Sequence, residues 1–216
     1  MHETLTISDL KEFANALHKA LGGNLNKKAQ DLMMPQGRLT IPDFTKPPKQ
    51  SAVLILFYPD KDGIYFPLIR RPRYDGAHSG QMALPGGKRE KEDEDLIYTA
   101  LRETCEEIGV CLGKADVLGV LSEHFIPVTN MIVLPVIGVL HETPIFEPEP
   151  NEVEEIFTIN LQEFFNRENK KRETWKLRGQ DVEVPFYLLK HQKVWGATAM
   201  ILSELEYLLT HALTTE

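Results

Sequence analysis

Residues 84–110, LPGGKREKEDEDLIYTALRETCEEIGV, form the most informative stretch of this chain. In its second half, apolar residues recur at the i, i+3, i+4, i+7 spacing of a helix that packs on a core. This predicted buried stripe consists of Ile97, Ala100, Leu101, Thr104 and Ile108. Glu103, Glu106 and Glu107 fall beside the stripe, within an arc of roughly 100°.

These three carboxylates indicate a metal site. Like charges on neighbouring helical turns repel, so the arrangement stabilises the helix only when a cation neutralises it. All-oxygen ligand sets suit Mg²⁺ or Mn²⁺, which also bind phosphates. The alternative is a solvated acidic helix face. The metal site is favoured because glycines precede the helix, Arg102 can hold a carboxylate in place, and Gly109 stands where a left-handed C-cap belongs.

The glycine, arginine and glutamate positions of this stretch resemble the Nudix box, G-x5-E-x7-R-E-U-x-E-E-x-G-U, in which U is aliphatic. The matching positions are Gly87, Arg102-Glu103, Glu106-Glu107 and Gly109. Thr104 replaces the first aliphatic residue. Fifteen steps separate Gly87 from Arg102, where the common pattern has fourteen, and Asp93 is the nearest equivalent of the first Glu. The resemblance implies an α/β fold, an α/β/α sandwich with a mixed sheet, and Mg²⁺ or Mn²⁺ as cofactor.

A second motif is similar to the one that precedes the box in coenzyme A diphosphatases, roughly L-L-T-x-R-S-x3-R-x3-G-x3-F-P-G-G. Arg71, Gly80 and Pro85-Gly86-Gly87 fall in register with it. Those enzymes commonly share the longer front half of the box. Residues 195–199, WGATA, are similar to a W-G-x-T-A stretch of the same group. The resemblance spans about residues 51–205.

Three positions depart from that second motif. Pro72 stands for the Ser, Gly76 for the second Arg and Leu84 for the Phe. If the second Arg holds a phosphate in the coenzyme A branch, its absence bears on the substrate. Arg70, Arg73 and His78 are the candidates to replace it.

The resemblance implies hydrolysis of the pyrophosphate bond of coenzyme A or acyl-coenzyme A, giving 3′,5′-ADP and 4′-phosphopantetheine or its acyl form. One alternative is a Nudix hydrolase of another nucleoside diphosphate derivative, such as ADP-ribose, or of a nucleoside triphosphate. The other is a non-catalytic nucleotide-binding sensor. The RE-x-x-EE pattern argues against a sensor, because a pure binder has no need of the clustered charge.

The predicted metal ligands are Glu103 and Glu107, with Glu106 in support, and Arg102 is expected to hold a carboxylate in place. Glycines let the backbone approach phosphate oxygens closely, and the planar guanidinium of an arginine can donate two hydrogen bonds to them. We therefore expect the substrate to bind beside the glycines and arginines before the central helix. The predicted substrate-binding residues are Arg70, Arg71, His78, Gln81, Gly86 and Gly87.

A general base is expected in the acidic loop EPEPNEVEE, residues 147–155. Glu152 is the first choice, followed by Glu154 and Glu155. His78 and His124 are alternative proton carriers, since histidine titrates near neutral pH. A solvated acidic loop is the alternative for each glutamate.

Composition limits the classes of partner. The 216 residues carry a formal net charge of −8, which disfavours a general nucleic-acid binder. No apolar run approaches the ~20 residues of a membrane span, and the first residues do not resemble a signal peptide. We therefore expect a cytoplasmic protein without a nucleic-acid or membrane partner, in which Cys105 and Cys111 are reduced thiols. The resemblance implies that the partner is a small-molecule, coenzyme A-like diphosphate substrate. The sequence leaves the oligomeric state open, with a homodimer as one option.

The chain divides into an N-terminal extension, residues 1–50, and a Nudix-like domain, residues 51–216. The extension contains a predicted helix at 8–21, with Ser8 as its cap, followed by a proline-punctuated segment that packs on the core. Around the central helix, strands are expected at 51–58, 64–70, 117–121, 131–140, 156–159, 176–178 and 182–188, and helices at 161–166 and 198–213. Pro135 indicates an edge or a bulge in its strand.

Overall fold

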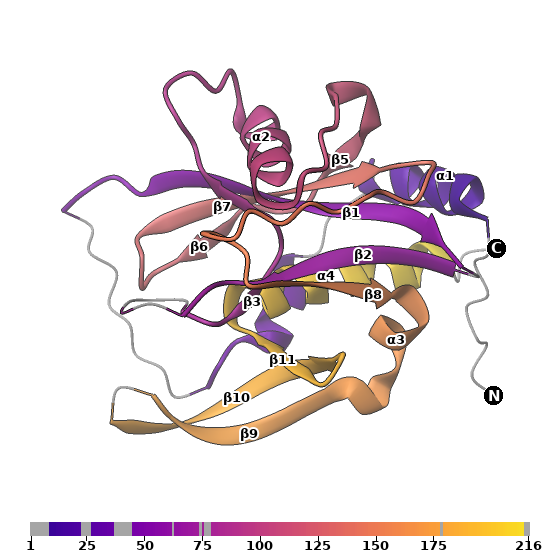
Figure 1. Ribbon diagram of the computed structural model, residues 1–216. Helices are drawn as coiled ribbons and strands as arrows, with labels where there is room; N and C mark the ends of the chain where they lie inside the picture. The colour runs from indigo at the N-terminus through magenta and orange to yellow at the C-terminus, as the bar shows by residue number, and fades with distance from the viewer. Residues whose placement is uncertain are drawn as a thin grey trace.

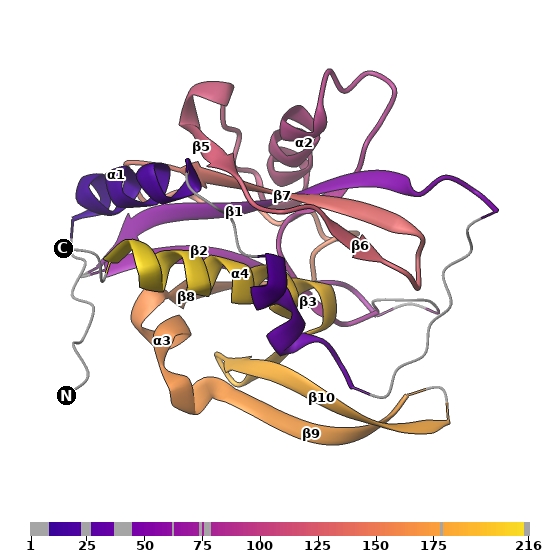
Figure 2. The same ribbon diagram turned by 180° about the vertical axis from the view of Figure 1, so that it is seen from behind.

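A computed structural model describes residues 9–22, 27–36, 45–61, 63–73, 75, 79–177 and 179–213. A mixed β-sheet has helices on both faces, and a smaller sheet lies beside it (Figures 1 and 2). The strand order of the large sheet is β3 (Met82–Ala83), β2 (Gly63–Arg70), β1 (Lys49–Asp60), β7 (Met131–Val139) and β5 (Val117–Val120). Three further strands branch from it: β4 (Gly86–Lys88) on β1, β6 (His124–Ile126) on β7 and β8 (Glu155–Asn160) on β2.

The strand β1 organises the large sheet, because it pairs in parallel with β7 and antiparallel with β2 and β4. Successive side chains of a strand point to opposite faces, and both faces of β1 are covered by helices. One face packs on α2 (Leu96–Ile108), and the other on α1 (Leu10–Leu21) and α4 (Gly196–Leu213). The burial of both faces explains the continuous apolar run at 51–58 and confirms the predicted α/β/α sandwich.

The smaller sheet is antiparallel and consists of β9 (Lys170–Leu177), β10 (Gln180–Leu189) and β11 (Gln192–Trp195). The short helix α3 (Leu161–Phe165) and the turn η3 (Arg167–Asn169) connect it to β8. Another short helical turn, η2 (Lys114–Asp116), precedes β5. The predicted hairpin is present, although β9 begins six residues earlier than the expected strand at 176. Its exposed, charged side chains hide the apolar alternation that marks a strand.

Pro135 lies inside β7, where the neighbouring strand is interrupted. The end of β5 pairs Val120 with Val136, and β6 starts by pairing His124 with Val133. Between them, the carbonyl of Pro135 accepts the N–H of Leu121 at 2.9 Å. Proline has no N–H to offer a partner, and the gap between β5 and β6 removes the need for one.

The described part of the N-terminal region contributes to the core. The side chain of Asp9 caps α1 by accepting the N–H groups of Lys11 and Glu12, whereas Ser8, the expected cap, lies outside the described residues. Phe13 is fully buried, and its ring centroid lies 4.8 Å from that of Phe57 on β1. The view from behind shows α1 beside the sheet and α4 (Figure 2). A division of the chain at residue 50 stays a prediction.

A polar network fastens the next segment, η1 (Lys27–Met33), to α4. The amide of Gln30 donates to the fully buried carboxylate of Glu204 at 2.8 Å, and its oxygen lies 2.8 Å from His124 Nδ1. Ser122 donates to the other oxygen of Glu204 at 2.6 Å. His124, an alternative proton carrier in the sequence analysis, is thereby engaged in this network, which belongs to the core around α4. Within the described ranges, no helix is long and apolar enough to cross a bilayer.

We expect Phe13→Ala to lower the free energy of unfolding by about 3–5 kcal/mol, because it removes a fully buried ring from a close-packed core. Leu32→Ala is the matched control: this side chain is 63% exposed, and the change should stay within about 0.5 kcal/mol. Denaturant unfolding followed by circular dichroism measures both. Equal stability of Phe13→Ala and wild type would show that the N-terminal helix is not part of the cooperative core.

Candidate functional site

The helix α2 carries the acidic side chains, and its ends are fixed by local contacts. The Asp95 carboxylate accepts the N–H of Tyr98 at the N-terminus. At the C-terminus Gly109 adopts φ 73°, a left-handed conformation, and donates its N–H to the carbonyl of Cys105. The predicted buried stripe faces β1, with Ala100, Leu101, Thr104 and Ile108 at 5% exposure or less.

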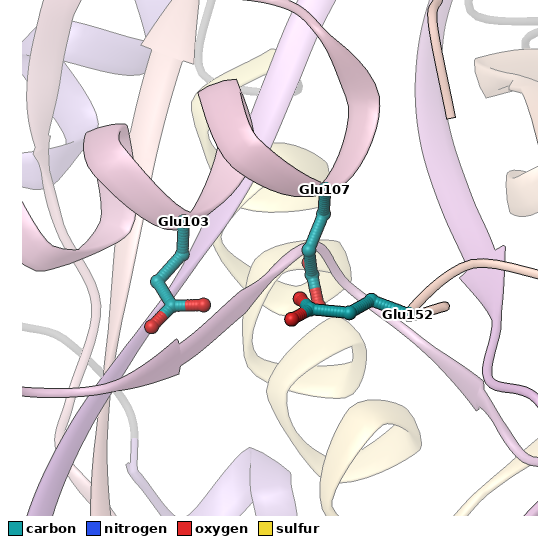
Figure 3. Close-up of side chains that lie close together, drawn as sticks. All are labelled: Glu103, Glu107 and Glu152. Carbon is teal, nitrogen blue, oxygen red and sulfur yellow. The ribbon is translucent and has the colours of Figure 1, made fainter. Parts of the chain in front are cut away.

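Three carboxylates converge below α2. Glu103, Glu107 and Glu152 each place one oxygen within 4.8 Å of the others (Figure 3). Glu107 is only 1% exposed, Glu103 is half-buried, and Glu152 comes from the exposed loop before β8. Glu106, expected as a supporting ligand, lies outside this group. Its side chain is 57% exposed and pairs with Arg102 Nη1 at 2.7 Å.

The Pro-Gly-Gly loop supplies the floor of the site. The N–H of Gly86 donates to Glu107 Oε2 at 2.7 Å. At φ 145° Gly86 has no room for a side chain, because a Cβ would lie 2.3 Å from the carbonyl oxygen of Ala52. A Cβ on Gly87 would lie 2.3 Å from the carboxylate of Glu103. Gly87 is therefore required for the Glu103 carboxylate to reach its place, and Gly86 for the close pairing of β4 with β1.

Arg102 holds the outer edge of the site. Its guanidinium contacts Glu103 at 3.0 Å and Asp93 at 2.9 Å. Asp93 is buried and also accepts from Thr99 Oγ1, and the Arg102 guanidinium holds the pKa of the Asp93 carboxyl well below its usual range. Asp93 was absent from the predicted site residues. Its place near the Glu position of the Nudix pattern was the signal that could have identified it.

The two adjacent arginines occupy different surroundings. Arg71 Nη2 donates to the carbonyl of Gly86 at 3.2 Å and lies 3.9 Å from Glu107 Oε1, inside the site. Arg70 instead pairs with Glu154 and Glu155. The carbonyl of Gln81 accepts the N–H of Arg71 at 3.1 Å and so contributes to the shape of this loop.

Two further positions that the sequence analysis singled out lie outside the described residues: His78 and Gly76. Their roles stay predictions. Arg73, the other candidate to replace the second Arg of the coenzyme A motif, is exposed. It lies on the wall of a pocket together with Asp75, Ser79 and Gly80.

Burial makes the carboxylates costly to ionise without a cation. It raises the pKa of Glu107 from 4.5 to about 7, although Arg71 and the Gly86 N–H oppose the shift. Burial also raises the pKa of Glu103, against the effect of Arg102. The carboxylate oxygens of Glu103, Glu107 and Glu152 converge beside the two glycines. Such oxygen atoms are the ligands that a hard divalent cation prefers. The residues present therefore fit Mg²⁺ or Mn²⁺.

The expectation of two reduced thiols is wrong: Cys105 and Cys111 form a disulfide. Their sequence separation of six matched no known redox or metal motif, so sequence reasoning treated them as separate. The left-handed turn at Gly109 reverses the chain after α2 and brings their Cα atoms to 4.4 Å, within bonding range. The bond closes the last turn of α2, next to Glu106 and Glu107.

The mixed-sheet sandwich and the acidic helix preceded by a Pro-Gly-Gly loop define an α/β protein that carries a Nudix box. The family model of the NUDIX domain matches residues 48–178, more than half of the chain. The chain therefore belongs to the Nudix family. The match ends before β10, β11 and α4, which supply much of the core on the second face of the sheet.

Relatives agree with this assignment. The chain is 36% identical over 167 residues to "Nudix hydrolase 15, mitochondrial" of Arabidopsis thaliana, covering 74% of this chain and 58% of that protein. It is 34% identical over 136 residues to "Mitochondrial coenzyme A diphosphatase NUDT8" of Homo sapiens, covering 62% and 57%. The matched region thus spans little more than half of each relative.

A solved structure supports the fold alone. The crystal structure of a MutT/nudix family protein from Enterococcus faecalis aligns with a TM-score of 0.51 at 19% identity. The alignment covers 97% of this chain and 76% of that one.

We expect Gly87→Ala to weaken Mn²⁺ binding at least tenfold while the protein stays folded. The new Cβ displaces the flexible end of Glu103 rather than the backbone. Gly113→Ala is the control, since its nearest neighbouring atom is 3.8 Å away. Titration of Mn²⁺ by electron paramagnetic resonance, with thermal unfolding in EDTA, separates ligand displacement from unfolding. Unchanged Mn²⁺ affinity in Gly87→Ala would contradict the placement of Glu103.

The metal-free protein should lose stability as the pH rises. Burial raises the pKa of Glu107 from 4.5 to about 7 in the folded state. The protonated Glu107 carboxyl therefore favours the folded state fully below pH 4.5, and this contribution to the free energy of unfolding is lost as the pH rises through 7. The loss is on the order of 3 kcal/mol, at about 1.4 kcal/mol per unit. Thermal unfolding in EDTA at pH 5 and pH 8 measures it, and millimolar Mg²⁺ should restore the melting temperature at pH 8.

Glu107→Gln is the matched variant for this experiment, because the amide keeps the shape of the side chain and cannot ionise. Its melting temperature in EDTA should depend less on pH than that of the wild type. The same pH slope in both proteins would show that another group causes the effect.

Proposed function

We propose that the chain hydrolyses the diphosphate bond of coenzyme A or acyl-coenzyme A with Mg²⁺ or Mn²⁺. The observation that carries this proposal is the convergence of Glu103, Glu107 and Glu152 with Arg71 above the Pro-Gly-Gly loop. A cation held by these carboxylates would act together with the Arg71 guanidinium to neutralise the negative charge of a diphosphate. Phosphoryl transfer depends mainly on such positioning and charge neutralisation.

Three further observations support coenzyme A within the diphosphate class. The stretch from Gly87 to Arg102 is one residue longer than in the common box, and Asp93 within it pairs with Arg102. Arg71, the residue in register with the coenzyme A motif, reaches the site. One relative, NUDT8, is named a mitochondrial coenzyme A diphosphatase.

In the proposed reaction a water oxygen attacks one phosphorus of the diphosphate. The bridging P–O bond breaks, and the products are 3′,5′-ADP and 4′-phosphopantetheine or its acyl form. A bound Mg²⁺ or Mn²⁺ would neutralise phosphate charge and lower the pKa of a bound water. Glu103 and Glu107 would hold the cation, and Arg102 keeps Glu103 in position. Arg71 would bind a phosphate oxygen through its planar guanidinium.

We assign Glu152 to the activation of the attacking water. It is the most exposed of the three carboxylates, and its side chain points toward the Glu107 carboxylate from a separate segment, the loop before β8 (Figure 3). From there it can hold the cation, accept the proton of the water, or both in turn. Glu106, which pairs with Arg102 and points to solvent, we assign to holding that arginine.

The deciding experiment compares coenzyme A, acetyl-coenzyme A, dephospho-coenzyme A, ADP-ribose and ATP with Mg²⁺ and with Mn²⁺. We expect the highest kcat/KM for coenzyme A or its acyl form. Glu107→Gln should reduce kcat by roughly a hundredfold or more, because it removes a charged ligand from the reacting centre. Faster turnover of ADP-ribose than of coenzyme A would move the assignment to another Nudix substrate. Near wild-type activity of Glu107→Gln would refute the ligand assignment.

A further inference from the structure

The loop that carries Glu152 is fastened at both ends. It leaves β7, runs back beside α2 and turns down into β8 (Figure 1). We call residues 147–155 the Glu152 strap. Its backbone turns back on itself where Glu152 and Val153 both donate to the carbonyl of Glu149, at 3.0 and 2.8 Å. The position of the Glu152 carboxylate therefore depends on what holds the strap.

The first anchor is the C-terminal end of α2. The N–H groups of Glu147 and Glu149 donate to the carbonyls of Ile108 and Glu107, each at 2.9 Å. The last carbonyls of a helix have no partner within the helix, and the strap provides one for two of them. A Cβ on Gly109 would lie 2.7 Å from the Cβ of Glu147, so this approach requires glycine.

The second anchor is Arg70. Its carbonyl accepts the N–H of Glu154 at 2.8 Å, and it stands opposite Glu155 in the β2–β8 pairing. Its side chain holds the same two residues: Nε lies 3.3 Å from Glu154 Oε2, and Nη2 donates to Glu155 Oε2. The guanidinium carbon lies 5.3 Å from the ring centroid of Phe157.

The charges around Arg70 oppose a role in binding phosphate. Two carboxylates surround one guanidinium, which leaves this group with a net negative charge. A phosphate would have to displace them. Arg71, on the opposite side of the chain, faces Gly86 and Glu107 instead. Arg70 is the last residue of β2 and Arg71 the first residue after it, and the two side chains contact different partners.

We propose that Arg70 is a positioning residue that sets the place of Glu152 by holding Glu154 and Glu155, and that it does not bind substrate. Val153, 3% exposed, lies between Glu152 and Glu154 and transmits this constraint through a packed side chain. The inference rests on the proposed function in so far as Glu152 is a metal ligand.

A mutant cycle tests the link without any substrate. Mn²⁺ affinity is measured by electron paramagnetic resonance for wild type, Arg70→Met, Glu152→Gln and the double variant. Loss of a residue that orients a ligand typically weakens metal binding 10–100-fold. We expect Arg70→Met to lie in that range, and the double variant to bind no more weakly than Glu152→Gln. Wild-type affinity in Arg70→Met, or additive losses in the double variant, would overturn the proposal.

Two matched variants sharpen the result. Arg71→Met removes a cation 3.9 Å from Glu107, so it should raise the KM for the diphosphate without weakening Mn²⁺ binding. Arg172→Met removes an ion pair of the β9–β10 hairpin, Arg172–Glu183, and should change neither quantity. A raised KM with unchanged Mn²⁺ affinity in Arg70→Met would instead make Arg70 a phosphate ligand.

Should Arg70→Met fail to fold, as judged by thermal unfolding in EDTA, the double substitution Glu154→Gln with Glu155→Gln breaks the same link and leaves Arg70 in place. It should also weaken Mn²⁺ binding at least tenfold. Wild-type affinity there counts against the proposal. Failure of the protein to hydrolyse coenzyme A would refute the proposed substrate, while the Mn²⁺ cycle would still decide the role of Arg70.

Discussion

The buried carboxylate of Glu107 is the constraint on which the site depends. A carboxylate that is 1% exposed is expensive to ionise unless hydrogen bonds or a cation compensate. Here one backbone N–H, from Gly86, and one guanidinium, 3.9 Å away, provide part of the compensation. The remainder is what a divalent cation would supply. The same feature that weakens the metal-free fold thus prepares a site for a strongly charged ligand.

The surrounding structure serves to keep that carboxylate in place. The buried stripe of α2 packs on one face of β1, and β4 pairs with the same strand, so helix and glycine floor share one support. A site built on regular elements is held more rigidly than one built on loops alone. Only Glu152 comes from an exposed loop, and that loop is tied to the helix end and to β2.

Sequence periodicity predicted the central helix and its buried side well, because both depend on residues a few positions apart. It could not rank the glutamates beside that stripe. An arc of about 100° includes both the edge of the buried face, where Glu107 lies, and the solvent side, where Glu106 lies. The third member of the group, Glu152, was predicted as a general base, but its distance in sequence gave no sign that its carboxylate lies with those of Glu103 and Glu107. The disulfide was missed although the left-handed cap at Gly109 was predicted, because a separation of six residues matches no cysteine motif and the 4.4 Å between the two Cα atoms depends on the path of the chain after α2.

The two arginines show which part of the site the motif predicts and which part only the structure reveals. The coenzyme A motif places Arg71 in register and leaves position 70 unspecified, yet the side chains look equivalent in sequence. Their difference comes from their positions, Arg70 at the end of β2 and Arg71 in the loop that follows, and from the carboxylates that each one contacts. Glu154 and Glu155 pair with Arg70, while Arg71 lies beside Glu107. The acidic strap therefore does more than carry Glu152, because its remaining charges hold Arg70 away from the group of Glu103, Glu107 and Glu152.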